Sequence, residues 1–330
     1  MQGMGDKAKP ILVGLMWHSM TSDNMGVLAL TASQVEIIER AAAQAGRELK
    51  IRVFGTFGTK PPLDLGPQCE QGPAFRPKRM LLGQSDFYRQ VRECDVLFDI
   101  GEGDSFTDIY GMHRFVLQIG SKLVALATGK PLILSPQTIG PFESAWTRGL
   151  AAWVMRRCAR VYARDQISKK YLQTLGVDKN ADEAIDVAFL LPFIKPVSLP
   201  DNGGKIRVGV NVSGLMLSGG YTGANQFGLK VDYPALVRTL LERLLARGDV
   251  NVFLVPHVLS DSMPEEDDYR ASIALAVEFP GVTVSPKFST PSEAKSFISG
   301  LDFFTGARMH SCVAAFSAGV PVVPMLSLIH

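Results

Sequence analysis

The stretch LDFFTGARMHSCVAAFSAGVPVVPM, residues 301–325, holds a short apolar run, a polar loop, a helical segment and a second apolar run. LDFFTG and VPVVPM have the length and composition of buried strands, and RMHSCVAAFSAG is typical of a helix that ends at a glycine. This order is that of a β-α-β unit, which builds a parallel sheet covered by helices on both faces. The segment therefore predicts the α/β class.

The same alternation extends toward the amino terminus. In the first half we expect strands at ILVGLMW, KIRVFGTF, CDVLFDIG, PLILSPQTIGP and VYARD, with helices that include Leu28–Gly46 and QISKKYLQTLG. The pattern restarts later with strands KIRVGVNVSG and VNVFLVPHV and helices PALVRTLLERLLARG and PSEAKSFISG. Between the halves, LPFIKPVSLPDNGG has the composition of a linker. We predict two Rossmann-like domains facing a cleft, residues 1–192 and 205–330, joined by a linker at 193–204.

Composition narrows the function classes. The 330 residues are 46% hydrophobic and 20% charged, with 34 basic against 32 acidic side chains, so a dedicated nucleic-acid binder is disfavoured. The amino terminus lacks the long apolar region and cleavage site of a signal peptide, and no apolar run is long enough for a membrane helix. Four scattered cysteines without a C-x-x-C pair indicate reduced, mostly buried thiols in the cytoplasm and disfavour a zinc site.

Ligands of parallel sheets bind at the carboxyl ends of the strands, and this rule selects a set of loop residues. Three of the five histidines fall in that set. Its members are His18, Asp23, Asn24, Gly26, Glu102, Gly103, Asp104, Gln137, Gly140, Asn211, Gly214, His257, Arg308 and His310. The concentration of histidine favours a site at the strand ends.

The R-x-H segment combines three features that suit an anion beside a proton donor. Gly306 permits a tight turn after the strand, and a helix that starts within the next residues presents free N–H groups. Arg308 adds a planar guanidinium, and His310 can exchange a proton near neutral pH. The alternative is that Arg308 is solvated and His310 caps or packs, which is the ordinary fate of an isolated R-x-H.

The other loops carry open alternatives. One loop contains three carboxylates, those of Glu102, Asp104 and Asp108. A metal site there is less favoured than a helix cap at Asp104 or Ser105. Gln137, Thr138 and Gly140 offer hydrogen bonds to a polar acceptor such as a sugar, or form a simple turn. His257 faces the cleft or caps a helix, Lys295 is by default a solvated helix lysine, and Pro264–Arg270 is interpreted as a solvated helix start.

Several familiar site types are missing from the sequence. It contains no G-x-S-x-G elbow, no P-loop and no complete G-x-G-x-x-G fingerprint. Serine hydrolases, P-loop NTPases and standard dinucleotide-dependent dehydrogenases are therefore disfavoured.

Taken together, NMGVLAL, GEGDSFTDIYG, SPQTIGPF, YARDQIS, LGV, DVAFLLP and VPHV, followed by PSEAKSFISGLDFFTGARMHSCVAAFSAGVPVV, form an ordered series. The series resembles the polysaccharide pyruvyl transferase family from about Asn24 to Val323. R-x-H is its most specific part. The resemblance implies a two-Rossmann fold like that of glycosyltransferase-B enzymes. It also implies transfer of pyruvate from phosphoenolpyruvate to two sugar hydroxyls, which forms a ketal and releases phosphate, with no metal or organic cofactor.

The resemblance also implies roles for individual residues. Arg308 matches the family's anion-binding arginine and His310 its catalytic histidine, while Lys295 and Arg164 match basic positions for the charge of the donor. Asn211 and His257 lie in strand-end loops of the carboxyl-terminal, donor-side domain and are expected to bind substrate. The loops of the amino-terminal domain, where the sugar acceptor is expected, contribute Asn24, Gly26, Asp104, Gln137 and Gly140.

Partners and location follow from the same resemblance. The partners implied are phosphoenolpyruvate and a sugar or lipid-linked oligosaccharide acceptor, and no nucleic acid. The expected location is the cytoplasm, including the periphery of the inner face of the membrane, and homo-oligomer formation is left open.

The sequence departs from the family pattern at two places. Relatives usually continue past VPVVPM with a Tyr- and Lys-containing segment and further helices, whereas this chain ends at LSLIH, so a truncated carboxyl end is expected. Val27 stands where many relatives have an acidic residue, so no aspartate role is expected in that loop. The rival interpretations are a nucleotide-sugar glycosyltransferase of the same fold and a non-catalytic sugar-binding relative.

Overall fold

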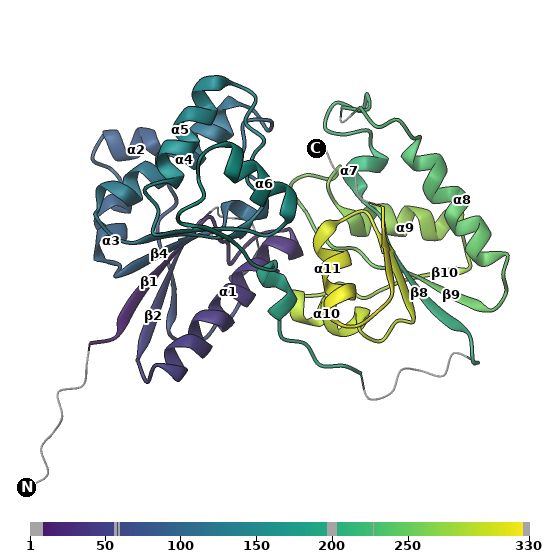
Figure 1. Ribbon diagram of the computed structural model, residues 1–330. Helices are drawn as coiled ribbons and strands as arrows, with labels where there is room; N and C mark the ends of the chain where they lie inside the picture. The colour runs from purple at the N-terminus through teal and green to yellow at the C-terminus, as the bar shows by residue number, and fades with distance from the viewer. Residues whose placement is uncertain (1–8, 56–57, 59, 197–202, 227, 326–330) are drawn as a thin grey trace, which may run out of the picture. The chain divides into compact units, whose positions relative to one another are not determined.

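The computed structural model describes residues 9–55, 58, 60–196, 203–226 and 228–325, and these fall into two compact units (Figure 1). Unit 1 takes the described residues of Met1–Thr21 and Leu30–Val187, and unit 2 those of Ser22–Ala29 and Ala188–His330. The short segment Ser22–Ala29 therefore packs with the carboxyl-terminal half. The predicted linker, 193–204, lies partly outside the described residues, as does the terminal LSLIH.

Unit 1 is built on a seven-stranded sheet in the order β3-β2-β1-β4-β5-β6-β7, in which every paired strand is parallel. The strand order reverses at β1, which pairs with β2 on one side and β4 on the other, as in doubly wound folds. The strands are β1 (Ile11–Met16), β2 (Leu49–Phe54), β3 (Cys69–Gln71), β4 (Val96–Asp99), β5 (Leu132–Gln137), β6 (Arg160–Ala163) and β7 (Ala181–Glu183).

Helices cover both faces of this sheet: α1 lies on one face, and α4 and α5 lie on the other (Figure 1). α1 begins three residues before the predicted Leu28, because the Asn24 carbonyl already accepts the N–H of Val27 and Leu28. The helices are α1 (Met25–Gln44), α2 (Pro77–Leu81), α3 (Phe87–Glu93), α4 (Met112–Ala127), α5 (Ala145–Met155) and α6 (Gln166–Thr174), with 3₁₀ turns η1 (Gly101–Gly103) and η2 (Val187–Leu190).

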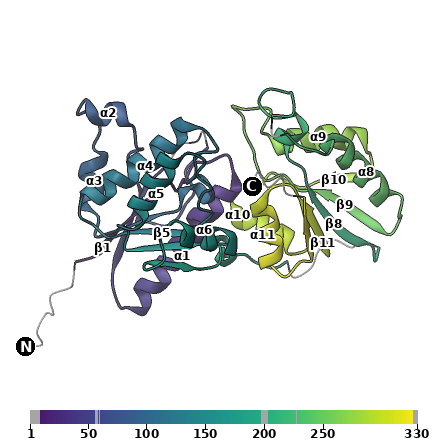
Figure 2. The same ribbon diagram turned by 45° about the horizontal axis from the view of Figure 1, so that its top comes forward.

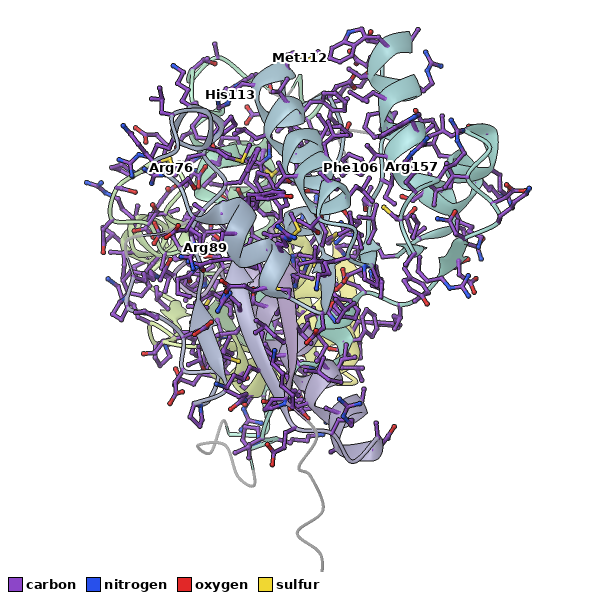
Figure 3. The ribbon with its side chains drawn as sticks, turned by 90° about the vertical axis from the view of Figure 1, so that its left-hand side faces the viewer. Arg76, Arg89, Phe106, Met112, His113 and Arg157 are labelled. Carbon is purple, nitrogen blue, oxygen red and sulfur yellow. The ribbon has the colours of Figure 1, made fainter. Side chains whose placement is uncertain are left out.

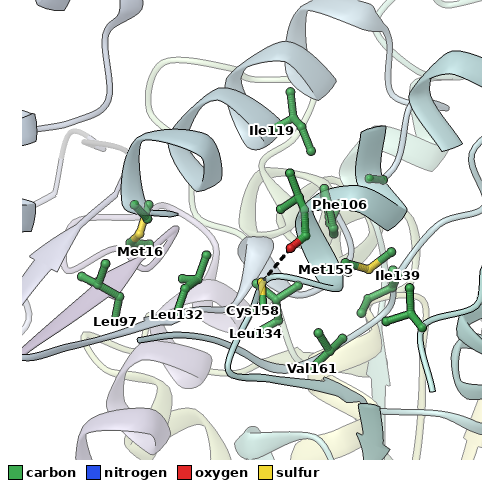
Figure 4. Close-up of a cluster of buried hydrophobic side chains, with 14 of the residues drawn as sticks. Met16, Leu97, Phe106, Ile119, Leu132, Leu134, Ile139, Met155, Cys158 and Val161 are labelled. Atoms are coloured by element: carbon green, nitrogen blue, oxygen red, sulfur yellow. Dashed lines mark hydrogen bonds between the residues drawn. The ribbon is translucent and has the colours of Figure 1, made fainter. Parts of the chain in front are cut away.

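The larger buried cluster of unit 1 lies between the sheet and the α4–α5 layer (Figure 4), and a smaller one includes residues of α1. Leu97, Leu134 and Val161, from three neighbouring strands, are fully buried there. The Cys158 Sγ donates to the Val154 carbonyl at 3.5 Å, and burial raises the pKa of the Cys158 thiol to about 12. All four cysteines are free, and three of them are buried, which confirms the prediction that the thiols are mostly buried.

Unit 2 repeats the plan on a smaller scale, with a five-stranded parallel sheet in the order β10-β9-β8-β11-β12. Figure 2 shows α8 and α9 on one side of this sheet and α10 and α11 on the other. Its elements are β8 (Ile206–Asn211), α7 (Gly214–Leu217), α8 (Tyr233–Leu245), β9 (Val250–Leu254), α9 (Asp268–Glu278), β10 (Val282–Val284), α10 (Pro291–Ile298), β11 (Phe303–Gly306), α11 (Met309–Ser317) and β12 (Val322–Pro324).

The predicted fold class, two Rossmann-like α/β units, is confirmed. The long apolar strands were predictable because buried parallel strands are nearly continuous apolar runs. The edge strands β3, β7 and β10 were not predicted, since each has three residues and little apolar periodicity. Within the described residues, no helix combines the length and hydropathy needed to cross a bilayer.

Candidate functional site

The carboxyl ends of β8 and β11 lie side by side in unit 2, because Asn211 pairs in register with Gly306. Gly306 does not adopt a left-handed backbone, and the predicted tight turn is wrong: it is the last residue of β11. A Cβ there would lie 2.8 Å from the Ser311 Oγ and 3.0 Å from the Asn211 Cβ. The glycine is needed for the close approach of the two strand ends.

Arg308 occupies the N-cap position of α11 and is held on three sides. Its backbone N–H donates to the Asn211 Oδ1 at 2.8 Å, and its Nη2 donates to the Asp268 Oδ1 at 2.8 Å and to the Glu266 carbonyl at 3.1 Å. Burial opposes the charge, but the Asp268 carboxylate outweighs it and raises the pKa of Arg308. Within the described part of the chain the Nη1 makes no hydrogen bond, and the side chain is 20% exposed. A guanidinium fixed in this way keeps Nη1 as its donor for an incoming anion.

Asp268 is the residue that sequence reasoning missed. It is fully buried, so the interpretation of Pro264–Arg270 as a solvated helix start is wrong at this position. Besides Arg308, its carboxylate accepts the backbone N–H groups of Gly214 at 3.0 Å, His257 at 3.2 Å and Val258 at 3.1 Å. One carboxylate thereby joins the loops after β8, β9 and β11.

Two histidines lie beside this ion pair. His257 is 2% exposed, and neither ring nitrogen has a hydrogen-bond partner among the described residues. Burial, with the charges of His310 and Arg308, lowers the pKa of His257 to about 3, so its ring is neutral at physiological pH. His310, the second residue of α11, is half-buried. The neutral ring of His257 can donate one hydrogen bond and accept another, whereas His310 is placed to exchange a proton.

The segment Ser22–Ala29 completes the cluster. The Met25 N–H donates to the His257 carbonyl at 3.0 Å, and Asn24 forms a bridge with Val258 and caps its own turn by accepting the Gly26 N–H at 2.8 Å. Gly26 lies directly against the His310 imidazole. Asn24 and Gly26 were expected with the amino-domain loops; instead they pack against the carboxyl-terminal unit because of these contacts.

Replacing Gly26 with alanine is expected to displace His310. A Cβ at Gly26 would lie 2.5 Å from the His310 Nδ1, closer than real Cβ contacts. We expect a loss of about 1–3 kcal/mol in the free energy of unfolding, the usual range for overpacking. Urea unfolding followed by far-UV circular dichroism measures it.

A second substitution, His310→Ala, tests whether the contact between residue 26 and the His310 ring causes this loss. In the Gly26→Ala, His310→Ala double variant the clash is gone, so the penalty of Gly26→Ala should vanish. If the penalty persists in the His310→Ala background, the contact is not its cause.

Lowering the pH is expected to destabilise unit 2 through His257. In the unfolded chain this histidine titrates near pH 6.5, whereas its folded pKa is about 3. Since the unfolded state binds the extra proton between these values, stability is greatest above pH 6.5 and declines as the pH falls toward 3. The contribution is about 1.4 kcal/mol per pH unit within that window.

Urea titrations at about pH 7 and about pH 5 measure this slope. His257→Gln should reduce the slope of the unfolding free energy with pH by the contribution of one proton. His113→Gln, at an exposed position of α4, should leave the slope unchanged. Equal slopes in wild type and His257→Gln would contradict the assignment.

The remaining predicted acceptor residues lie at the carboxyl edge of the unit 1 sheet. Gln137 is buried at the end of β5, and its Nε2 donates to the Asp99 carbonyl at 2.8 Å. Gly140, with φ 71°, packs against the Tyr171 ring. The Asp104 Oδ2 accepts the Tyr110 hydroxyl at 2.9 Å. Gln137 and Gly140 are thus held by the fold, and Asp104 is the nearest of the three to solvent.

The loop that contains Asp104 and Ser105 was expected to cap a helix and, less strongly, to bind a metal ion. The interpretation of Asp104 or Ser105 as the next helix cap is wrong, because α4 begins after Gly111 without a side-chain cap. Among the described residues no group of three or more His, Cys, Asp or Glu is arranged to hold a metal ion.

Arg164 and Lys295 each bind other parts of the chain within their own unit. Arg164, after β6, donates to the Asp186 carboxylate and to the Thr138 hydroxyl, both at 2.9 Å, and is largely buried within unit 1. Lys295 is 1% exposed rather than solvated, and its Nζ donates to the Phe189 carbonyl at 3.1 Å and the Leu191 carbonyl at 3.0 Å. Burial lowers the pKa of Lys295 to about 8. In this conformation the hydrogen bonds of both cations go to other residues of the protein.

A sequence model of the family described as polysaccharide pyruvyl transferase matches residues 32–327. The chain belongs to this family. The match includes both units and the R-x-H segment, and the resemblance inferred from the motifs is confirmed. The description of this family names a transferase activity.

Individual relatives are distant. The amylovoran biosynthesis protein AmsJ of Erwinia amylovora is 21% identical over 260 residues, which cover 72% of this chain and 58% of AmsJ. The chain thus spans less than two thirds of the length of this relative.

Solved structures confirm the fold. A putative UDP-N-acetylglucosamine 2-epimerase from Listeria monocytogenes superposes with a TM-score of 0.57 at 13% identity, over 96% of this chain and 79% of that one. Alr3699/HepE from Anabaena, in complex with UDP and glucose, gives a TM-score of 0.51 at 12% identity, over 95% of this chain and 80% of that one. At these identities the likeness shows a shared two-domain, glycosyltransferase-B-like fold.

Proposed function

We propose that the protein transfers pyruvate from phosphoenolpyruvate to two hydroxyls of a sugar, as a ketal, during the synthesis of an exopolysaccharide or cell-surface glycan. The observation that carries the proposal is the placement of His310, neutral His257 and the Asp268-anchored Arg308 at one sheet edge, in a chain of the pyruvyl transferase family. The name of AmsJ supports the biosynthetic context.

The donor carries a phosphate and a carboxylate, and the edge offers donors for one of these anions. The Arg308 Nη1 is one such donor. The first N–H groups of α11 are others, since the start of a helix lacks internal acceptors and α11 has no side-chain cap. The neutral ring of His257 adds one N–H without the cost of a second buried cation. Lys295 and Arg164 reach the donor only by releasing their present partners.

The reaction needs three proton transfers and two new C–O bonds. A proton adds to the methylene carbon of phosphoenolpyruvate, and the cation at the neighbouring carbon is captured by the first sugar hydroxyl, which gives up its own proton. The second hydroxyl then attacks the same carbon as the C–O bond to phosphate breaks. Its proton passes to the departing phosphate, so the ketal and inorganic phosphate are the products. We assign His310 to the proton transfers, because it is a half-buried imidazole at the start of α11 and an imidazole can both donate and accept a proton.

The acceptor is expected at the loops with Asp104, Gln137 and Gly140, on the expectation that a sugar is recognised by hydrogen bonds from strand-end loops. The oligosaccharide is proposed to be lipid-linked, so the enzyme works at the inner face of the membrane.

The experiment that tests the proposal mixes the full chain, phosphoenolpyruvate and candidate glycans. Inorganic phosphate should appear only with an acceptor, and the glycan should gain the mass of pyruvic acid less water. The rival, a nucleotide-sugar glycosyltransferase of the same fold, releases nucleotide from a nucleotide sugar instead. Turnover with that donor alone would overturn the proposal, and absence of turnover with either donor would favour a non-catalytic sugar-binding relative.

A further inference from the structure

The outer side of α5 and the turn after it present a restricted set of side chains. From 145 to 160, every exposed residue larger than alanine is Trp or Arg: Trp146, Arg148, Trp153, Arg156, Arg157 and Arg160. Trp146 is 53% exposed and Trp153 is 41% exposed. The two tryptophan rings lie on the same face of α5, because residues seven apart on a helix are separated by about two turns.

The neighbouring helix α4 extends this apolar surface. Met112 and Val116 are 44% and 47% exposed. Leu123 of α4 and Gly149, Leu150 and Trp153 of α5 line an open hollow of about 400 Å³ between the two helices. Figure 3 shows Met112 at the upper end of α4 and Arg157 lower, toward α5. We call this surface, with the residues just named and Trp146, the α4–α5 face.

The rim of the face is rich in positive charge. Arg156 donates to the Leu175 carbonyl at 3.0 Å, and Arg157 donates to the Trp153 carbonyl at 3.2 Å and stacks 3.6 Å from the centre of its ring. In the part of the chain that the structure describes, Arg148, Arg156, Arg157 and Arg160 form no salt bridge. Between residues 109 and 164 the sequence contains one carboxylate, Glu143.

We propose that the α4–α5 face binds the surface of an anionic lipid bilayer. Exposed Trp rings beside Arg side chains of a single sign suit the boundary between headgroups and acyl chains, where the rings insert and the guanidinium groups remain at the phosphates. A protein partner would have to bring an excess of negative charge to match a rim in which arginines outnumber carboxylates. The inference rests on the proposed location at the membrane, but its test does not depend on transfer activity.

Flotation of the full chain with vesicles tests the proposal. Vesicles that contain phosphatidylglycerol should carry the protein upward at low salt, and vesicles of phosphatidylcholine alone should carry much less. Added salt should release the protein, because exposed charges are screened. Brominated acyl chains should quench Trp fluorescence in the bound state, since the rings enter the bilayer.

Matched variants identify the face. Arg156→Glu with Arg157→Glu should lower the partition coefficient at least about 25-fold, at about 5-fold per charge lost. Arg47→Glu with Lys50→Glu makes the same charge change at exposed positions after α1, on the opposite side of the sheet, and should have a much smaller effect. Trp153→Ser should weaken binding, whereas Val277→Ser, at a 79% exposed position of unit 2, should not.

Three outcomes would overturn the proposal. They are no flotation of the wild type with anionic vesicles, equal losses in the two double charge variants, and a wild-type dimer in sedimentation that Trp153→Ser dissociates without any vesicle binding. The last would assign the face to a second copy of this chain. Phosphate release with a soluble acceptor should be the same in all these variants, so failure here is distinct from failure of the proposed reaction.

Discussion

Replacing His310 with glutamine is expected to lower phosphate release from phosphoenolpyruvate by about 10²–10⁴-fold, the usual contribution of a positioned acid or base. Glutamine keeps hydrogen-bonding capacity at the site but cannot exchange a proton near neutral pH. The loss should therefore fall on kcat, with a smaller change in KM. Steady-state assays across pH measure both, and the wild type should show a titration that the variant lacks.

His113→Gln is the matched control, because this histidine is exposed on α4 and far from the chemistry in sequence. His257→Gln distinguishes substrate binding from proton transfer. A neutral His257 with a pKa of about 3 binds but does not transfer protons near neutral pH, so its variant should change KM more than kcat. If His257→Gln abolishes the pH titration and His310→Gln preserves it, the assignment is reversed.

Replacing Asp268 with asparagine is expected to lower the free energy of unfolding of unit 2 by about 3 kcal/mol. The change leaves the Arg308 guanidinium without its carboxylate, and breaking one side of a buried ion pair is strongly destabilising. It also weakens the acceptor for the N–H groups of Gly214, His257 and Val258. Activity should fall together with stability, because Asp268 positions Arg308.

The three tryptophans make this measurement specific. Trp17, Trp146 and Trp153 all belong to unit 1, so Trp fluorescence follows that unit while far-UV circular dichroism follows both. Asp268→Asn should shift the urea transition seen by circular dichroism more than the one seen by fluorescence. The neighbouring Asp267→Ala removes only the N-cap of α9 and should lower stability by about 1 kcal/mol. An Asp268→Asn effect no larger than this control would contradict the ion-pair account.

The sequence was informative where structure depends on local pattern. The apolar strands, the glycine-ended helices and the start of α11 at R-x-H follow from periodicity and capping, and the structure has them. The proximity of Asn211, His257 and Arg308 follows from the rule that the ends of parallel strands share an edge. These inferences need no knowledge of long-range packing.

Other predictions failed because they depend on long-range contacts. Asp268 lies in a run of four carboxylates that is typical of a solvated helix start, and only the loops after β8 and β11 explain its burial. Lys295 has the spacing of an exposed helix lysine, yet carbonyls about a hundred residues away hold its ammonium group. The packing of Gly26 against His310 joins residues at opposite ends of the chain, which no local signal indicates.

The central claim is that the donor is bound at the start of α11, and a crystal structure of the chain with an unreactive phosphoenolpyruvate analogue tests it most directly. We predict an anionic group of the analogue within hydrogen-bond distance of the Arg308 Nη1 and the first N–H groups of α11, with its reacting carbon facing His310. An analogue bound elsewhere, with Arg308 and His310 as they are now, would contradict the account.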